Sequence, residues 1–100
     1  MRDIILTSKY KKDLKAAQKT PRFKKYSTKL VNYLATLQRG DKLPPEADDH
    51  QLAKHSTKEY SRCREFKAAP DVCVVYRMSD DSIELVRIGQ HNNLGLTENI

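Results

Sequence analysis

The first third of the chain places its apolar side chains in a short run and then at helical spacing. The run Ile4-Ile5-Leu6 predicts one short strand within residues 1–7. Thr7 and Ser8 follow, and a hydroxyl side chain at this point can cap a helix. Three apolar side chains then recur every three or four residues, with lysines between them: Tyr10, Leu14 and Ala17. This spacing predicts an amphipathic helix of three turns or fewer.

A second, longer helix is predicted after residue 20. Thr20 suits the N-cap and Pro21 suits the first helical position, where the missing amide hydrogen of proline does no harm. Five apolar side chains then form a seam about five turns long: Phe23, Tyr26, Leu30, Leu34 and Leu37. Gly40 follows as a C-terminal stop. Because the two helices are joined by a short connection, we expect an antiparallel helical hairpin that buries both seams on one shared partner.

The rest of the chain is predicted to be a polar segment followed by three strands. Residues 41–58 lose the periodicity and contain Pro44-Pro45, so a long loop is predicted there. Residues 60–67, 72–78 and 83–88 have the β-branched and aromatic composition of strands. The order β-α-α-β-β-β predicts an α+β domain. In it, the helical hairpin packs on one face of a small twisted antiparallel sheet and leaves the other face open.

Composition and cysteine usage narrow the class of protein. One hundred residues with 38% hydrophobic side chains suffice for one modest core, so a single domain over residues 1–100 is expected. No apolar stretch approaches the roughly 20 residues of a membrane span and no signal peptide is apparent, so a cytoplasmic location is expected. Cys63 and Cys73 lie in or beside predicted strands and are expected to be free thiols. Their spacing from His50 and His55 matches no standard zinc pattern, so no metal or other cofactor is expected.

The charge is distributed unevenly along the chain. The formal net charge is +6: residues 1–40 hold eleven basic and two acidic residues, net +9, and residues 41–100 hold eight and eleven, net −3. A basic half attracts a polyanion, and for a cytoplasmic protein RNA or DNA is the natural one. From the charge alone, a solvated helix face that keeps the protein soluble is an equally good explanation.

The last two predicted strands form a hairpin with an acid and an imidazole at its open end. If the turn is centred on Asp80-Asp81, opposed positions sum to 161, and Asp71 lies beside His91. With a three-residue turn the sum is 162, and the two residues lie directly opposite each other. The first register pairs Arg77 with Glu84, which favours it electrostatically, but the sequence does not choose between the two. Both registers bring the carboxylate and the imidazole to one edge of the sheet.

A carboxylate, an imidazole and an arginine can together cleave RNA without a metal ion. One group takes the proton from the 2′-hydroxyl, another protonates the departing 5′-oxygen, and a cation stabilises the phosphorane. Histidine suits the proton transfers and arginine suits the phosphate oxygens. The alternative is structural. Asp71 starts a strand after a proline, as in ordinary turns, and His91 can be a solvated residue beside Asn92-Asn93.

Three motifs together resemble one bacterial family. They are DHQL at 49–52, CREFKAAPDVCVVYRM at 63–78 and ELVRIGQH at 84–91, which follow two basic helices. In this combination the chain resembles, over nearly its whole length, the YafQ branch of the RelE superfamily, toxins of type II toxin–antitoxin modules. The resemblance implies a small α+β fold and an endoribonuclease that cuts messenger RNA in the ribosomal decoding site without a metal. It also implies a cognate antitoxin, expected to be DinJ-like with a ribbon-helix-helix N-terminal domain.

The resemblance also assigns roles to individual residues. His50, Asp71 and His91 match catalytic positions of the family. The expected base towards the 2′-hydroxyl is Asp71 or His50, and the expected acid towards the leaving oxygen is His91, which gives a 2′,3′-cyclic phosphate. Three residues are expected to hold the phosphate: Arg64, Lys67 and Arg87. The lysines on the predicted helices are assigned to ribosomal RNA or to an acidic antitoxin segment: Lys11, Lys12, Lys15, Lys24 and Lys25.

The chain departs from the family pattern at two places near the site. Lys67 stands where the family often has a histidine, and lysine is a poor proton shuttle at neutral pH. The closing aromatic of the family is missing after His91, and His55 falls in a longer segment between the first two motifs. Two alternatives therefore stay open: a RelE-fold toxin without nuclease activity, such as a gyrase poison, and a non-catalytic RNA-binding protein.

Overall fold

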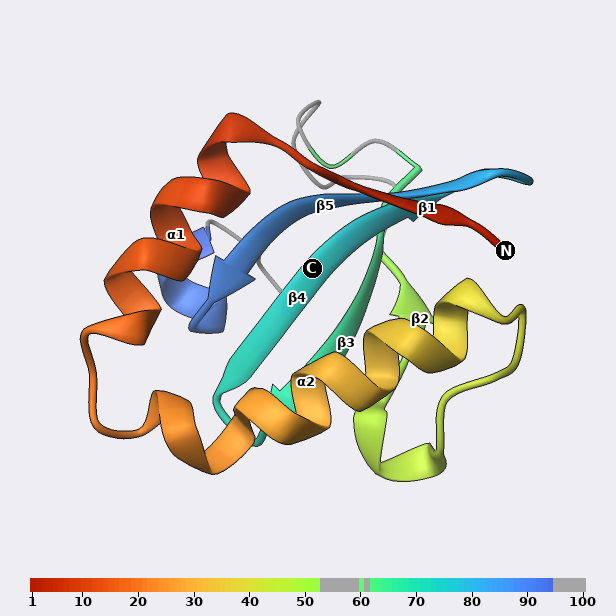
Figure 1. The fold of residues 1–100 in the computed structure, drawn as a ribbon. Helices are drawn as coiled ribbons and strands as arrows, with labels where there is room; N and C mark the ends of the chain where they lie inside the picture. Colours follow the sequence, from red (N-terminus) through yellow and green to blue (C-terminus); the bar gives the residue numbers. More distant parts are fainter. Residues whose placement is uncertain (53–59, 61, 95–100) are drawn as a thin grey trace.

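The computed structural model describes residues 1–52, 60 and 62–94, and its two helices lie on one side of a single twisted sheet (Figure 1). The elements along the chain are β1 (Asp3–Leu6), α1 (Ser8–Gln18), α2 (Phe23–Gln38), the 3-10 helix η1 (Pro45–Ala47), β2 (His50–Gln51), β3 (Arg64–Ala69), β4 (Val72–Met78), β5 (Ser82–Gly89) and the 3-10 helix η3 (His91–Leu94). No described helix combines the length and the apolar character that a bilayer crossing requires.

The sheet is mixed and has the strand order β1-β5-β4-β3-β2. β1 runs parallel to β5, with Ile4 opposite Ile83, so the predicted purely antiparallel sheet is wrong at this edge. Nothing in a four-residue apolar run indicates which sheet edge it will join or in which direction, because strand pairing is decided over long sequence distances. The meander from β3 to β5 is antiparallel, as predicted. The α+β class is confirmed.

The segment predicted as a long loop contains ordered structure before residue 53. Its residues 45–47 form η1, and His50–Gln51 form β2, which pairs antiparallel with β3. The predicted order β-α-α-β-β-β therefore lacks one short strand. A two-residue strand leaves no periodicity in the sequence, and only its partner on β3 defines it. The first strand of the meander begins at Arg64, later than the predicted start at residue 60.

The two helices begin differently from each other. The Thr7 side chain accepts a hydrogen bond of 3.1 Å from the amide of Tyr10, so it caps α1 as predicted. α2 begins at Phe23 without a side-chain cap, two residues later than predicted. Thr20 is not its N-cap, because its hydroxyl donates instead to the carbonyl of Ala17 at 2.7 Å and so completes the end of α1.

The end of α2 follows the prediction. Gly40 has a φ of 84°, a left-handed conformation that glycine adopts without steric cost. Its amide donates to the carbonyl of Leu37 at 3.0 Å, and the amide of Asp41 donates to the carbonyl of Thr36 at 3.1 Å. These two bonds satisfy carbonyl groups that the helix end would otherwise leave unpaired.

The alternation of side chains along the strands gives the sheet two faces with different cores. The helix-covered face holds the main core, in which aromatic and aliphatic residues of both helices meet inward residues of β3, β4 and β5. The opposite face holds a smaller core, which we call the second core: Tyr60, Cys63, Cys73, Val75, Val86 and Leu94, with Leu52 packed against it. The prediction that this face is open is therefore wrong. Neither cysteine forms a disulfide, as predicted, and both are buried.

The hairpin of β4 and β5 uses both of the registers that the sequence allows. Near the turn the paired positions sum to 161, and Arg77 lies opposite Glu84 with an ion pair of 2.5 Å between Nη1 and Oε1. Towards the open end they sum to 162, with Cys73 opposite Gly89. The change requires one extra residue on β5, and Val86 is this bulge. The open end thus continues in the register that brings positions 71 and 91 towards each other.

Tyr10 gives a test of the main core at high pH. Burial, with smaller contributions from Tyr26 and Asp13, raises the pKa of its phenol from 10 to about 12. Because the folded pKa lies above the unfolded one, the neutral phenol stabilises the fold fully below pH 10, and this stabilisation is lost as the pH rises towards 12. In Tyr10→Phe this loss should be absent. Between pH 8 and 11.5 the wild type should lose about 2 kcal/mol more free energy of unfolding than the variant, measured by urea denaturation. Equal losses would contradict the assignment.

Candidate active site

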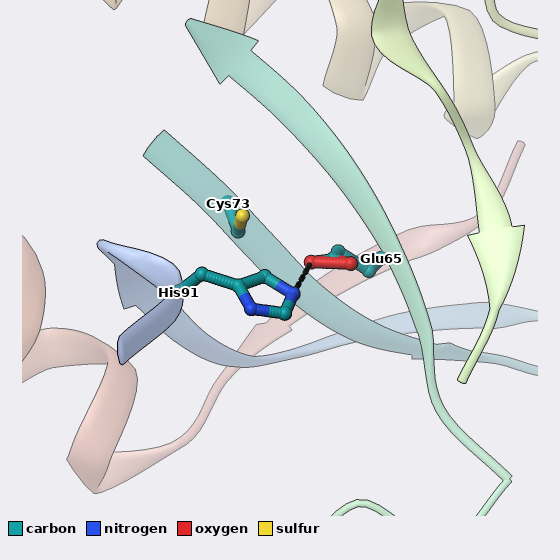
Figure 2. Close-up of side chains that lie close together, drawn as sticks. All are labelled: Glu65, Cys73 and His91. Atoms are coloured by element: carbon teal, nitrogen blue, oxygen red, sulfur yellow. Dashed lines mark ion pairs between the residues drawn. The ribbon is translucent and has the colours of Figure 1, made fainter. Parts of the chain in front are cut away.

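A buried carboxylate that two histidines contact lies on the face of the second core. Glu65 is 1% exposed and projects from β3. Its Oε1 lies 3.2 Å from Nε2 of His50, and its Oε2 lies 3.0 Å from Nε2 of His91. In Figure 2 the His91 ring and the Glu65 carboxylate point towards each other. A carboxylate is this deeply buried only when cations or hydrogen bonds compensate it, so the two imidazoles account for its position.

Strand pairing and a tight turn place the two histidines. His50 lies directly opposite Glu65 in the β2–β3 pair. His91 starts η3 immediately after β5, and η3 folds back so that Leu94 is 4% exposed in the second core. A Cβ on Gly89 would lie 3.3 Å from the Leu94 side chain, so a residue without a side chain allows this close approach. The Tyr60 hydroxyl donates a hydrogen bond to the carbonyl of Leu94 and holds the turn in place.

His50 is held at both nitrogens of its ring. Nδ1 lies 2.7 Å from the backbone carbonyl of Asp48, while Nε2 faces Glu65. Both neighbours are hydrogen-bond acceptors, so only the doubly protonated imidazolium can donate to both. In this state His50 is arranged as a cation that donates protons. To act as a base it must first leave one of the two acceptors.

Lys67 adds a second cation beside the paired histidines. It lies two residues after Glu65 on β3 and therefore on the same face of the sheet. Its Nζ is 3.7 Å from Oδ2 of Asp48, the residue whose carbonyl contacts His50. The site on this face therefore combines two imidazoles and an ammonium around one buried carboxylate and one exposed carboxylate. Such a group of cations can stabilise the extra negative charge of a phosphorane.

Asp71 lies in the turn between β3 and β4 and pairs with a residue that sequence reasoning missed. Both of its carboxylate oxygens accept hydrogen bonds from the guanidinium of Arg22, in the connection between the helices. The Arg22 guanidinium holds the pKa of Asp71 below its ordinary value, chiefly through this hydrogen bonding. A carboxylate with a lowered pKa is a weaker base, so Asp71 can take a proton at the 2′-hydroxyl only when Arg22 has moved away.

The two arginines expected at the phosphate are each paired with an acid. Nε of Arg64 lies 3.2 Å from Oδ1 of Asp49, which also accepts a hydrogen bond from Tyr76 at 2.7 Å. Because Arg64 precedes Glu65 on the strand, it points to the opposite face of the sheet. Nε of Arg87 lies 2.6 Å from Oδ2 of Asp13 on α1. These contacts therefore do not place Arg64 or Arg87 beside His50 and His91.

The expected RNA-contacting lysines of α1 lie on the solvent side of the helix. Lys11, Lys12 and Lys15 are exposed, while Tyr10 on the same helix is buried in the main core. Lys24 and Lys25 of α2 are exposed too. These positions keep the helices available for a polyanion, and their role stays a prediction. His55 and Gly95 lie outside the described residues.

Sequence reasoning did not identify three residues in or near the site as functional: Arg22, Glu65 and Cys73. Glu65 had one available signal, since it is a charged residue inside a segment of strand composition. A charged residue that interrupts a buried strand has to be paired, which makes it a candidate for function. The pairing of Arg22 had no such signal, because a guanidinium in a basic helical region is indistinguishable from its neighbours.

One group of possible metal ligands exists among the described residues. Donor atoms of Glu65, Cys73 and His91 all lie within 4.8 Å of one another, and Figure 2 shows the three side chains together. Carboxylate, thiolate and imidazole are the three kinds of zinc ligand. Only Cys73 belongs both to this group and to the combination of His50, His55 and two cysteines considered from spacing.

Comparison with solved structures shows that the chain shares its α+β fold with small bacterial toxins. A copper-bound leucine-to-serine variant of a Helicobacter pylori toxin is 27% identical with a TM-score of 0.76 over 94% of this chain and 99% of that one. The Escherichia coli DinJ–YafQ complex is 28% identical, with a TM-score of 0.74 over 94% and 98%. A metal-bound Helicobacter pylori toxin is 32% identical, with a TM-score of 0.72 over 94% and 99%.

The family itself follows from the sequence match. The model of the family described as "Bacterial toxin of type II toxin-antitoxin system, YafQ" matches residues 2–95. This chain therefore belongs to the YafQ family of toxins from type II toxin–antitoxin systems, as the resemblance predicted. A comparison with curated protein sequences gives no match.

The pairing of Arg22 with Asp71 leads to a testable expectation. In Arg22→Ala the hydrogen bonds that favour the charged carboxylate are lost, so the pKa of Asp71 should rise towards its ordinary value. An NMR titration that follows the Asp71 carboxyl carbon measures this directly. Arg39→Ala removes a surface ion pair with Asp41 and serves as the matched control, in which the Asp71 titration should not move. An unchanged titration in Arg22→Ala would show that the pair does not persist in solution.

Proposed function

We propose that this toxin is an endoribonuclease that cuts messenger RNA on the ribosome and acts as a single cytoplasmic domain. The observation that supports this best is the convergence of His50 and His91 on the buried carboxylate of Glu65. Two imidazoles brought together from segments 41 residues apart, with an ammonium beside them, form a set of groups that can move protons and stabilise a phosphorane without a metal.

His91 is proposed as the general acid. Its side chain is 22% exposed, so the ring can reach a leaving 5′-oxygen while Nε2 stays next to Glu65. Glu65 orients the imidazole and balances its positive charge, so it is a positioning residue and does not itself contact RNA. The departing 5′-oxygen takes the proton as its bond to phosphorus breaks, and the 2′-oxygen remains bonded in a 2′,3′-cyclic phosphate.

The base is proposed to be Asp71 or His50, and each must be released first. Asp71 is bound by Arg22, and both nitrogens of His50 face acceptors. An RNA phosphate offers a competing anion for Arg22, which would free the Asp71 carboxylate next to the 2′-hydroxyl. Lys67 is proposed to contact the phosphorane, and Arg64 and Arg87 to contact neighbouring phosphates once these compete with Asp49 and Asp13.

A cognate antitoxin is the proposed inhibitor. The structurally similar YafQ of Escherichia coli has been solved in complex with DinJ, and we extend this partnership to the present chain as a DinJ-like antitoxin with a ribbon-helix-helix N-terminal domain. The exposed lysines of α1 and α2 offer positive charge either to ribosomal RNA or to an acidic segment of that antitoxin. These two ligands would then compete for the same face.

Substitution of His91 tests the proposed nuclease. In His91→Ala, ribosome-dependent cleavage should fall by about 10²- to 10⁴-fold, the usual contribution of a general acid, while the fold stays intact. Primer extension on a translated message measures the cuts, and circular dichroism checks the fold. His55→Ala is the matched histidine control and should cut normally.

Two outcomes of that experiment would contradict the proposal. Equal cleavage by His91→Ala would remove His91 from the mechanism. Toxicity with an intact message and damaged DNA would indicate a gyrase poison on the same fold.

The role of the α1 lysines has a separate test. If Lys11, Lys12 and Lys15 contact ribosomal RNA, the logarithm of the association constant for ribosomes should fall linearly with the logarithm of salt concentration. Replacement of all three by glutamine should lower the steepness of that slope by about two to three. Cosedimentation with 70S ribosomes at several salt concentrations measures it. An unchanged slope would show that these lysines are solvated and do not contact RNA.

A further inference from the structure

The buried face of the site contains a thiol that the proposed cleavage does not use. Cys73 on β4 is 2% exposed, and its sulfur lies with donor atoms of Glu65 and His91 inside a distance of 4.8 Å. We propose that Glu65, Cys73 and His91 form a binding site for a borderline divalent metal ion, with Zn²⁺ as the reference case, and that the bound ion switches off the nuclease.

Glu65 gives the first argument that these residues fit a metal ion. Its Oε2 is buried and accepts no well-aligned hydrogen bond from the described residues, although Nε2 of His91 lies 3.0 Å away. A buried carboxylate oxygen without an aligned donor is energetically costly, and a cation would compensate it. Figure 2 shows the Glu65 carboxylate, to which this oxygen belongs, pointing towards the His91 ring.

The distances between the donor atoms give the second argument. Zinc ligands at about 2.0 to 2.3 Å from a tetrahedral ion lie about 3.3 to 3.8 Å from one another. Nε2 of His91 and Oε2 of Glu65 are 3.0 Å apart, close to that spacing. All donor atoms of the group lie within 4.8 Å, so closure needs side-chain shifts of about 1 Å. Three protein ligands leave one coordination position for water.

The kind of donor and the local charge give the third argument. A thiolate and a carboxylate together balance the charge of a divalent ion, and a thiolate with an imidazole favours zinc or copper over magnesium or calcium. Lys67, which lies opposite Cys73 in the β3–β4 pair, directs its ammonium to within 3.7 Å of Asp48.

Metal binding and catalysis would exclude each other, and this part of the inference rests on the proposed function. Nε2 of His91 is the nitrogen that faces Glu65, and a metal ion held by both residues occupies that nitrogen's lone pair. Once Nε2 binds the metal ion, the ring can no longer form the doubly protonated imidazolium, so its Nδ1–H is too weak an acid to protonate the leaving oxygen. Metal therefore acts as an inhibitor of a nuclease that works without it.

Binding is tested first, with the metal alone and no RNA. Titration of the purified chain with Co²⁺ should produce a thiolate-to-cobalt absorption band with one ion per chain, and Zn²⁺ should displace it. Cys73→Ser should lose the band and bind Zn²⁺ at least about 100-fold more weakly, since outer-shell partners alone contribute about 10- to 100-fold. Cys63→Ser is the matched control, because Cys63 is a buried thiol of the same second core outside the group. It should keep the band.

Several results of this titration would overturn the site. They are no thiolate band in the wild type, an equal band in Cys73→Ser, or loss of the band in Cys63→Ser with retention in Cys73→Ser. Circular dichroism confirms that each variant is folded. If Cys73→Ser unfolds, His91→Gln replaces it, since this variant changes a partly exposed residue and removes a second ligand.

Inhibition is tested second and separates failure of the site from failure of the proposed function. Cleavage with Zn²⁺ is divided by cleavage with a chelator for each variant, so differences in basal rate cancel. The ratio should be far below one for the wild type and Cys63→Ser, and near one for Cys73→Ser. Cobalt binding in a chain that never cleaves RNA leaves the metal site standing and refutes the nuclease. Equal inhibition of all three variants refutes the switch at Cys73.

Discussion

The Glu65 carboxylate is the constraint on which the arrangement of the site depends. It is 1% exposed and lies beside the buried Phe66 on β3, and a charge in that position destabilises the fold unless cations or hydrogen-bond donors are placed beside it. The imidazoles of His50 and His91 lie beside it, one brought by β2 and the other by η3. The same interaction therefore holds two peripheral segments against the sheet and gathers the groups proposed for catalysis.

The sheet separates stability from chemistry by using its two faces differently. The helices cover one face and build the main core there, including Phe66, Tyr76 and Leu85. Among the described residues the opposite face holds the small second core, and there Glu65 lies beside the side chains of His50 and His91. β5 contributes to both faces. The bulge at Val86 shifts the register of the β4–β5 pair, and the end of β5 then leads into η3, whose Leu94 packs in the second core. A site built in this way sits on rigid strands but remains reachable from solvent through His50, whose side chain is 45% exposed.

Several cations that are proposed to contact RNA form ion pairs with carboxylates of the same chain. Arg22 binds Asp71, Arg87 binds Asp13, and Lys67 lies near Asp48. The Arg87–Asp13 pair is largely buried, whereas the Arg22–Asp71 pair is exposed, and exposed pairs contribute little to stability and exchange readily for other partners. A phosphate backbone or an acidic protein segment can thus replace the internal carboxylates without a large change of fold. This arrangement explains how a chain with a net charge of +6 can present a site without a concentrated positive charge in its free form.

Sequence patterns were enough to predict the α+β class, the extents of the helices to within two residues, the meander, the unbridged cysteines and the family. These depend on local periodicity, on turn residues such as Gly40 and on motifs that can be read directly. The sequence also led to His50, Lys67 and His91, which the structure places near one another. Asp71 is instead bound by Arg22, and Arg64 and Arg87 are bound by acids, and the sequence could identify none of these partners. Only the tertiary structure decided the parallel pairing of β1, the strand β2, the covered second face and the central place of Glu65. Each of these depends on contacts between residues far apart in the chain, and no local pattern records which distant segment a strand or a charge will meet.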